Sequence, residues 1–405
     1  MTNTIKWLWL STMRGMTPFK ISCLMKRYGS IEEIYKQSRY YDVEHINNTD
    51  KMQLMNKDLT AAQKVYKDVC DCGAYIMTCD NPHYPKTLKN IEPMPYVLYM
   101  KGNPMNLDNI LGIGVVGTRN NTDYGAMCAS KISYRLGKLG ATVISGMALG
   151  IDCIAMHAAV KAGAKTIGVL GTGIDIAHPS QNRWLFDEVE KTGLIISEYS
   201  PGTHGNKGTF PQRNRIIAGL SKGVLVIEGS SKSGSLITAG FAIEYNRDVF
   251  AIPRSIGVKN RQGKLMDGTN ALIQEGAKLV TCAEDILSEY QHLMRFVIAD
   301  KDDYIPEYRD IAPKNIKSKP KETKPKETKQ EVKPEKKTDI SSILCKASNE
   351  TEKNVINLLN GKELYPDEIT QLLDENIGGL GVTLTLMETK GIIKKLPDGR
   401  YVLNI

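Results

Sequence analysis

The sequence lacks any long uninterrupted run of apolar residues. Its longest apolar stretches, such as Gly223–Ile227, are far shorter than the roughly 20 residues that a membrane-spanning helix needs. The N-terminal segment MTNTIKWLWLSTMR has an apolar run too short for a signal peptide, and Ser11 and Thr12 interrupt it. We therefore expect a cytoplasmic protein without a membrane anchor. Hydrophobic residues make up 41% of the chain, enough for a sizeable packed core, which excludes wholesale disorder.

Cysteine is also scarce, with eight among 405 residues. Without a secretory leader, this number argues for reduced thiols rather than a disulfide framework. Cys70, Cys72, Cys79 and His83 lie close together in sequence but lack the CxxC spacing that is typical of a zinc site. We therefore predict no metal site.

The positive charge is concentrated in one segment. The chain carries a net charge of +8, and residues 314–337, with ten Lys and four Glu, account for +6, which leaves only +2 for the remainder. This segment repeats KPKET in tandem from Lys319 to Thr328 and has almost no apolar residues. We expect an extended, solvated linker, either a simple tether or an auxiliary contact for a polyanion. A binding face on the folded part must be argued from local motifs.

Short apolar strands alternate with amphipathic helical patterns from about residue 111 onward. This alternation predicts an α/β fold with a doubly wound parallel sheet, in which ligands bind beyond the carboxyl ends of the strands. Helices are expected between the strands, for example Tyr124–Leu139 and Asp152–Ala162. The expected strands are Ile113–Val116, Thr142–Ser145, Thr166–Leu170, Leu194–Ser197, Val224–Glu228 and Val249–Ile252.

A small helical region precedes this alternating part. Thr17-Pro18 predicts the start of a helix that Gly29 ends, and Ser30–Glu33 has capping-box spacing for the next helix. Residues 84–95 are punctuated by proline and are expected to form an extended connector.

Near the C-terminus we expect a separate compact unit. Three short helices, Glu352–Leu359, Tyr365–Leu373 and Thr383–Thr389, precede a hairpin formed by residues 391–396 and Tyr401–Leu403. This pattern resembles a winged helix. A protein-interaction module without a role on DNA is the alternative.

Two nucleotide-binding motifs do not apply. Gly112–Gly117 matches GxGxxG, but its glycines lie inside the strand, and no Asp or Glu occurs between Tyr124 and Ile151 to bind a ribose. We therefore expect neither a nicotinamide nor another cofactor. The sequence has no GxxxxGK[ST], which argues against an ATP-driven motor.

Small and donor-rich residues follow successive predicted strands. Gly117, Thr118 and Arg119 follow the first, Gly146 the second, and Gly171-Thr-Gly173 the third. Backbone N–H groups, hydroxyls and guanidinium groups at helix starts bind phosphate, so we predict a phosphate-lined cleft.

A further segment, FPQRNRIIAGLS, adds Arg213, Asn214 and Arg215 as phosphate contacts and Phe210 as a ring on which a base could stack. The alternative is that either arginine pairs internally, for instance with Glu198 or Glu228. Ser235 and Thr238 supply hydroxyls at the start of the following helix.

The motifs GTR, SGMALGID, FPQRNRIIAGLS and SGSLITAGFAIE, in this order and spacing, resemble the DNA-processing protein A family, also called Smf. The resemblance covers roughly residues 75–285 and implies an extended Rossmann-like domain that binds single-stranded DNA. Its implied division of the chain is a helical domain of the SAM or helix-hairpin-helix type at 1–75, the Rossmann-like domain at 76–293, a Lys/Pro/Glu-rich linker at 294–345 and a winged-helix-like domain at 346–405.

The resemblance also implies a function. Members of the family protect incoming DNA, help load the RecA recombinase onto it during natural transformation and usually form homodimers. By motif, Gly117, Thr118, Arg119, Arg213, Asn214 and Arg215 are the expected phosphate contacts, with Gly146, Ser235 and Thr238 as secondary ones. We suspect Leu272 and Ile273 as dimer contacts, with core packing as the alternative.

The chain departs from the family pattern at Arg254, where a glycine usually follows the proline, and this arginine could add a phosphate contact or alter its loop. The rival function is a nucleotide-processing enzyme of the related phosphoribohydrolase-like fold. Those enzymes place a Glu in a glycine-rich turn, but here no carboxylate occurs between Glu228 and Glu244. Since a proton carrier is missing there, we expect a binding protein with no catalytic residue rather than an enzyme.

Overall fold

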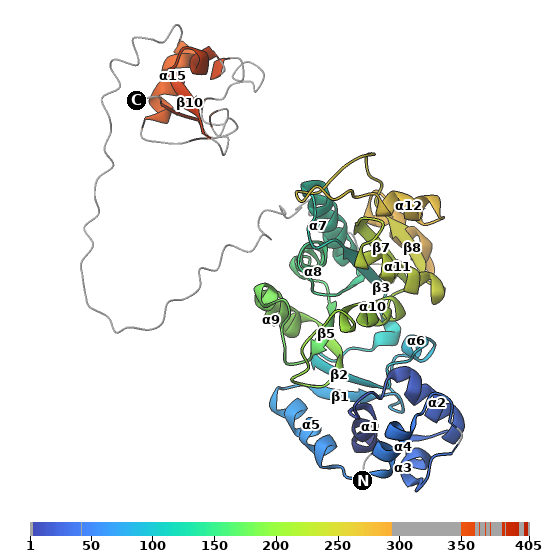
Figure 1. Ribbon diagram of the computed structural model, residues 1–405. Coiled ribbons are helices and arrows are strands. Elements are labelled where there is room, and N and C mark those ends of the chain that lie inside the picture. The colour runs from blue at the N-terminus through green and yellow to red at the C-terminus, as the bar shows by residue number, and fades with distance from the viewer. Residues whose placement is uncertain are drawn as a thin grey trace, which may run out of the picture. The chain divides into compact units, whose positions relative to one another are not determined.

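The computed structural model describes residues 3–41, 43–293, 350–360, 364, 369, 373, 383–384, 386–396 and 401–403. The predicted linker at 294–345 therefore lies outside the described residues. The chain divides into two compact units, within 1–316 and within 317–405, and each is described here by itself (Figure 1). No helix in these described stretches has the length and apolar character needed to cross a membrane.

Five helices open the first unit, and the sequence explains where two of them begin. The hydroxyl of Thr17 accepts the N–H of Lys20, Pro18 occupies the first helical position, and Gly29 ends the helix with φ 79°. Ser30 caps the next helix by accepting the N–H of Glu33, so both predicted starts are confirmed. The five helices are α1 (Asn3–Ser11), α2 (Pro18–Tyr28), α3 (Ile31–Lys36), α4 (Asn48–Met55) and α5 (Thr60–Asp71).

A sheet of nine strands follows, in the order β1-β2-β6-β5-β4-β3-β7-β8-β9. The pairs β1–β2 and β2–β6 are antiparallel, and every other pair is parallel. The strands are β1 (Tyr75–Thr78), β2 (Val97–Gly102), β3 (Gly112–Gly117), β4 (Thr142–Ser145), β5 (Thr166–Gly173), β6 (Leu194–Tyr199), β7 (Gly223–Glu228), β8 (Asp248–Ala251) and β9 (Lys278–Leu279).

All six predicted strands are confirmed, as β3 to β8, and the protein has the predicted extended, doubly wound α/β fold. The predicted extended connector at 84–95 is interrupted by the short helix α6 (Lys86–Lys89), and the strand β2 begins two residues after Pro95, at Val97. This strand joins the sheet antiparallel beside β6 and extends it beyond the parallel part. Its residues Val97–Met100 are all buried, so the apolar run after the last proline marks it.

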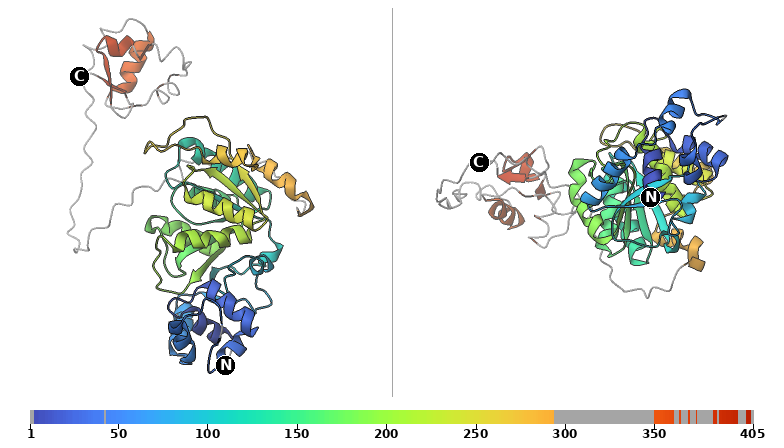
Figure 2. Two further views of the ribbon diagram at one scale, coloured as in Figure 1. Left: turned by 45° about the vertical axis from the view of Figure 1, so that its right-hand side comes forward. Right: turned by 90° about the horizontal axis from the view of Figure 1, so that it is seen from below.

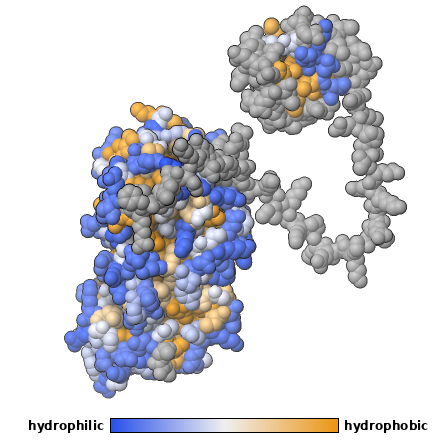
Figure 3. Space-filling view, turned by 180° about the vertical axis from the view of Figure 1, so that it is seen from behind, coloured by the Kyte–Doolittle hydropathy of each residue, from blue (hydrophilic) through white to orange (hydrophobic). Residues whose placement is uncertain are grey.

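Helices cover both faces of the sheet (Figure 2). The helices α7 (Asp123–Lys138) and α8 (Ile151–Lys161) pack together, as do α10 (Thr209–Leu220) and α11 (Gly234–Glu244). The remaining helical elements of this unit are α6 (Lys86–Lys89), η1 (Leu107–Asn109), η2 (Ser180–Asn182), α9 (Arg183–Thr192), α12 (Gly268–Gln274), α13 (Ala283–Leu287) and η3 (Ser288–Leu293). On the face of this unit seen in Figure 3, hydrophilic residues dominate and apolar ones are interspersed among them.

One hydrophobic core runs through the N-terminal helices and the sheet. The ring of Trp7 in α1 stacks on that of Tyr96 beside β2, with centroids 5.4 Å apart. The helical region thus shares its buried residues with the sheet, and the predicted boundary near residue 75 remains a prediction.

The second unit has a small core of its own. It contains α15 (Glu350–Leu359) and an antiparallel pair of strands, β10 (Ile393–Lys395) and β11 (Tyr401–Leu403). The first predicted C-terminal helix and the two hairpin strands are confirmed. The other two predicted helices lie only partly within the described residues, so the winged helix stays a prediction.

Candidate functional site

The chain reverses its direction of progress across the sheet at β3. From β3 it moves through β4 and β5 to β6, and then returns to place β7 on the other side of β3. The turns that leave β3 and β7 therefore diverge and open a crevice at the carboxyl ends of the strands, the usual ligand position in such sheets. A cavity of about 630 Å³ lies there, and we call it the cleft.

The cleft gathers most of the predicted site residues. Eight of the ten predicted DNA-binding residues line it: Gly117, Thr118, Arg119, Phe210, Arg213, Asn214, Ser235 and Thr238. Gly146 lies in a smaller adjoining hollow with Arg119 and Phe210. Arg215 lines neither of these two cavities.

The turn from β3 to α7, residues 118–122, forms one wall of the cleft. A Cβ added to Gly117 would lie 2.6 Å from Ile151, so only glycine fits there. The N–H groups of Thr118, Asn120 and Thr122 already donate within the protein, to the Glu228 carbonyl at 2.8 Å, the Thr118 hydroxyl at 3.3 Å and the Glu228 carboxylate at 2.9 Å. The side chains of Thr118 and Arg119 line the cleft. The predicted cradle is therefore made less of free backbone N–H groups than of side chains.

Arg213 lies in the floor of the cleft and is only 5% exposed. Its guanidinium donates to the carbonyl of Gly146 at 2.8 Å and also to the carbonyl of Val169. A Cβ on Gly146 would come within 2.6 Å of that guanidinium. The glycine predicted as a secondary contact therefore makes room for the arginine.

Asp152 faces this arginine. Burial raises the pKa of the Asp152 carboxyl, while Arg213 and backbone N–H groups lower it. One of these groups is the N–H of Gly146, which donates to Asp152 Oδ2 at 3.2 Å. Burial also lowers the pKa of Arg213 to about 10, so the guanidinium stays charged at neutral pH. The floor therefore carries the Arg213 guanidinium beside the Asp152 carboxyl, both held by buried partners.

Arg215 has different surroundings. Two residues along a helix rotate a side chain by about 200°, so Arg213 and Arg215 leave α10 in nearly opposite directions. Arg215 is 3% exposed and donates to both carboxylate oxygens of Glu198, at 2.7 and 2.8 Å. The internal pairing considered as an alternative is present, and the three predicted arginines do not form one cluster.

Four exposed cations surround the cleft: Arg119, Lys207, Lys232 and Lys264. Within the described part of the chain, none of the four pairs with a carboxylate. We call them the cationic rim. Of these four, only Arg119 was among the predicted DNA-binding residues. The three lysines stand in loops that follow β6, β7 and β8, and this position after strand ends could have identified them from the sequence.

Beside the rim, His178 stacks on Phe210 with ring centroids 5.1 Å apart. The guanidinium of Arg119 lies 5.6 Å from the centre of the same phenyl ring. Burial, Arg119 and Arg213 all lower the pKa of His178, which favours the neutral imidazole.

The start of α11 adds hydroxyls to the cleft. Ser235 and Thr238 are 6% and 1% exposed, and the hydroxyl of Ser235 bonds that of Ser233 at 2.5 Å. The Thr238 hydroxyl is buried without a hydrogen-bond partner among the described residues. Asn214 donates to the carbonyl of Gly234 at 3.2 Å, which ties α10 to this helix start.

The two predicted dimer contacts differ in exposure. Leu272 is 6% exposed and belongs to the core, whereas Ile273 is partly buried and packs against it. Core packing, the alternative considered for this pair, therefore describes Leu272. No group of three or more His, Cys, Asp and Glu side chains in the described stretches is arranged to hold a metal.

Comparison with known proteins places these features in context. The family model described as DNA recombination-mediator protein A matches residues 75–291. Protein Smf of Synechocystis is 33% identical over 402 residues, which cover 98% of this chain and 97% of that protein. DNA processing protein DprA of Streptococcus pneumoniae is 45% identical over 208 residues, 51% of this chain and 71% of that protein.

The X-ray structure of DNA processing protein A from Streptococcus pneumoniae has the same fold. It superposes with a TM-score of 0.62 at 36% sequence identity and covers 73% of this chain and 99% of that one.

Proposed function

This chain belongs to the DNA recombination-mediator protein A family, and from that membership we propose that it captures single-stranded DNA in the cleft. The observation that carries the proposal is the cationic rim, four exposed positive side chains without carboxylate partners in the described structure. Phosphates are the anions that such a groove tracks along a single strand.

The floor and the walls of the cleft give the strand further contacts. Arg213 supplies a buried charge beneath the path of the phosphates, and the hydroxyl of Thr118 supplies a donor. Phe210 offers a ring for base stacking, which tolerates any sequence because every base has a π-face. Binding of this kind leaves most base edges free.

Free base edges suit the biological role that we propose. The protein would protect incoming single strands and help load RecA recombinase onto them during natural transformation, as its family resemblance implies. That partner meets DNA in the cytoplasm, where we place this protein. A homodimer is part of the same proposal, and sedimentation of an Ile273→Arg variant tests whether that side chain lies in the contact.

An enzymatic role in nucleotide processing fits the cleft less well. Asp152 is the carboxylate among the cavity-lining residues, and backbone N–H groups and Arg213 already occupy it. A general acid or base must reach the proton that it transfers. We therefore propose a binding protein rather than an enzyme.

The test is a titration of the protein with a labelled oligothymidylate and with a duplex of equal length at several salt concentrations. For single strands the log–log salt slope changes by about 0.7 per phosphate neutralised, so the four rim cations would contribute roughly 3. We expect tight, salt-sensitive binding that favours the single strand. No binding at low salt would reject the proposal and make release of base from nucleoside monophosphates the next assay.

A further inference from the structure

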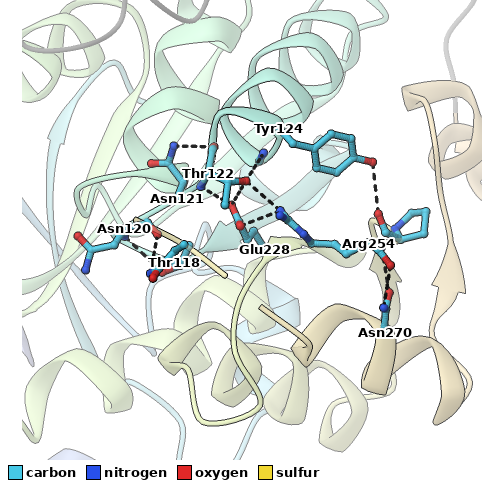
Figure 4. A network of polar contacts seen from close by, with 11 residues as sticks. Thr118, Asn120, Asn121, Thr122, Tyr124, Glu228, Arg254 and Asn270 are labelled. Atoms are coloured by element: carbon cyan, nitrogen blue, oxygen red, sulfur yellow. Dashed lines mark hydrogen bonds and ion pairs between the residues drawn. The ribbon is translucent and has the colours of Figure 1, made fainter. Parts of the chain in front are cut away.

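A buried ion pair lies beneath the turn that carries Arg119. Arg254 and Glu228 are joined by a distance of 2.7 Å between Nη1 and Oε1, and their side chains are 3% and 0% exposed. Glu228 ends β7, and Arg254 stands in the segment between β8 and α12. The pair thus links two parts of the chain at the switch point of the sheet (Figure 4).

Glu228 holds the turn at both ends. Its carbonyl accepts the N–H of Thr118 at 2.8 Å, and its Oε2 accepts the N–H of Thr122 at 2.9 Å. Thr122 is also the N-cap of α7, where its hydroxyl accepts the N–H of Gly125. A Cβ at Gly125 would lie 1.9 Å from Glu228 Oε2, so the glycine makes room for this carboxylate.

Arg254 completes the arrangement from the other side. Its Nη1 donates to the Thr122 hydroxyl at 3.1 Å, and its guanidinium lies 5.2 Å from the centre of the Tyr124 ring. Its backbone is fixed by Asn270, which accepts the N–H of Arg254 and donates to its carbonyl, both at 2.9 Å.

The segment that begins with Arg254 reaches the turn a second time. Asn260 donates to the carbonyl of Asn120 at 3.1 Å, and the side chain of Asn120 donates to Gln262 at 2.9 Å. The same segment carries Lys264 of the cationic rim. The turn with Arg119 and the loop with Lys264 are therefore joined by one set of contacts.

We propose that Arg254 is a positioning residue, which neutralises Glu228 and so fixes the turn 118–122 in the conformation that binds phosphate. This inference rests on the proposed capture of single-stranded DNA. Arg254 does not itself contact DNA, because a phosphate could reach its enclosed guanidinium only by separating it from a carboxylate that has no access to water. Without Arg254 that carboxylate is buried and uncompensated, which is strongly unfavourable.

The test compares binding of labelled oligothymidylate by Arg254→Met, Arg254→Lys and the double variant Glu228→Gln/Arg254→Met. Arg261→Met is the matched control, because Arg261 lies in the same segment but is 82% exposed and makes only a surface ion pair, with Asp123, which contributes little. We expect Arg254→Met to weaken binding about tenfold to a hundredfold, the range that loss of a group orienting a metal ligand costs at metal sites, with an unchanged salt slope. The Lys variant and the double variant should recover most of the affinity, and the control should keep all of it.

A direct phosphate contact would behave differently. Arg254→Met would then lower the salt slope by about 0.7, and the double variant would bind as weakly as the single one. Either result overturns the proposal.

Hydrogen exchange in the absence of DNA gives a readout that does not depend on the proposed function. We expect Arg254→Met to accelerate exchange of the Thr118 and Thr122 amides while the amides of β5 stay protected. Unchanged exchange at both positions overturns the positioning role. If wild-type protein binds no DNA but exchange responds as expected, the proposed function fails and the hold of Arg254 on the turn stands.

Discussion

Charged side chains around the cleft fall into two groups that the sequence does not distinguish. Arg119 and the three lysines of the cationic rim are exposed and have no carboxylate partner in the described structure, whereas Arg213 and Arg215 are buried among acceptors. Exposed cations can bind phosphates by releasing water and counterions, without breaking contacts within the protein, whereas buried cations already make hydrogen bonds or ion pairs inside it. Substitutions in the two groups should therefore change different measured quantities.

Arg119→Ala should weaken binding of oligothymidylate and lower the log–log salt slope by about 0.7, because one phosphate contact is lost. The melting temperature should stay close to that of the wild type, since the side chain is exposed. Lys64→Ala, an exposed lysine in the N-terminal helices, is the control and should change neither quantity. An unchanged slope and affinity for Arg119→Ala would remove this residue from the interface.

Arg215→Met should show the opposite pattern. Removing one partner of a buried pair leaves Glu198 uncompensated, so we expect a loss of about 3–5 kcal/mol in the free energy of unfolding. The protein that remains folded should bind DNA with the wild-type salt slope. Urea unfolding and the salt titration measure the two effects separately, and a reduced slope with intact stability would instead make Arg215 a phosphate contact.

His178 should couple binding to pH. Its pKa is lowered by burial and by the charges of Arg119 and Arg213. The unfolded chain, with a pKa near 6.5, therefore takes up a proton first, and the contribution of His178 to stability declines as the pH falls through about 6.5. A bound phosphate favours the protonated imidazole, so binding should take up a proton and tighten as the pH falls from about 7.5 to about 5.5.

An NMR titration of the His178 ring in free and bound protein measures this shift directly, and His178→Gln should abolish its share of the pH dependence. A free-protein pKa at or above the ordinary value, or identical values in both states, would contradict the expectation.

Elements of the fold could be predicted where one local pattern decides the structure. The apolar runs of β3 to β8 and the caps at Thr17 and Ser30 are local, and the structure confirms them. The pairing of β2 with β6 could not be predicted, because it joins residues almost a hundred positions apart. The same holds for the site. The ends of the predicted strands located the cleft, but the direction in which each arginine points depends on helix periodicity and on tertiary contacts.

Two helical glycines, Gly125 and Gly240, differ in whether the space around them allows a larger residue. Gly125→Ala would place a methyl group 1.9 Å from the Glu228 carboxylate, and such overpacking typically costs about 1–3 kcal/mol. Gly240 in α11 has no neighbour within 4 Å of an added Cβ, so Gly240→Ala should stabilise the helix by about 0.5–1 kcal/mol. Urea unfolding of both variants checks the contrast, and equal effects would mean that the Glu228 carboxylate moves aside freely.

At the scale of the whole molecule, most of the net positive charge lies in a different part of the chain from the cleft. Most of the net charge belongs to residues 314–337, outside the described residues, whereas the cleft lies entirely within the first unit. That unit closes its own hydrophobic core, which ends with Tyr290. A chain of residues 1–293 should therefore fold and retain the cleft without the rest of the protein.

We expect the 1–293 chain to bind oligothymidylate with the same preference over duplex and nearly the same salt slope as the full chain, if the lysine-rich segment is only a tether. An auxiliary contact predicts another result, because each lysine engaged on a phosphate adds about 0.7 to the slope. Removing even four of them would lower the slope of the full chain by roughly 3. A full-length variant with the lysines of 314–337 changed to glutamine distinguishes the loss of charge from the loss of the C-terminal unit. If its salt slope equals that of the 1–293 chain, the lysine charge alone explains the difference. If its slope equals that of the wild type, the C-terminal unit makes the contact.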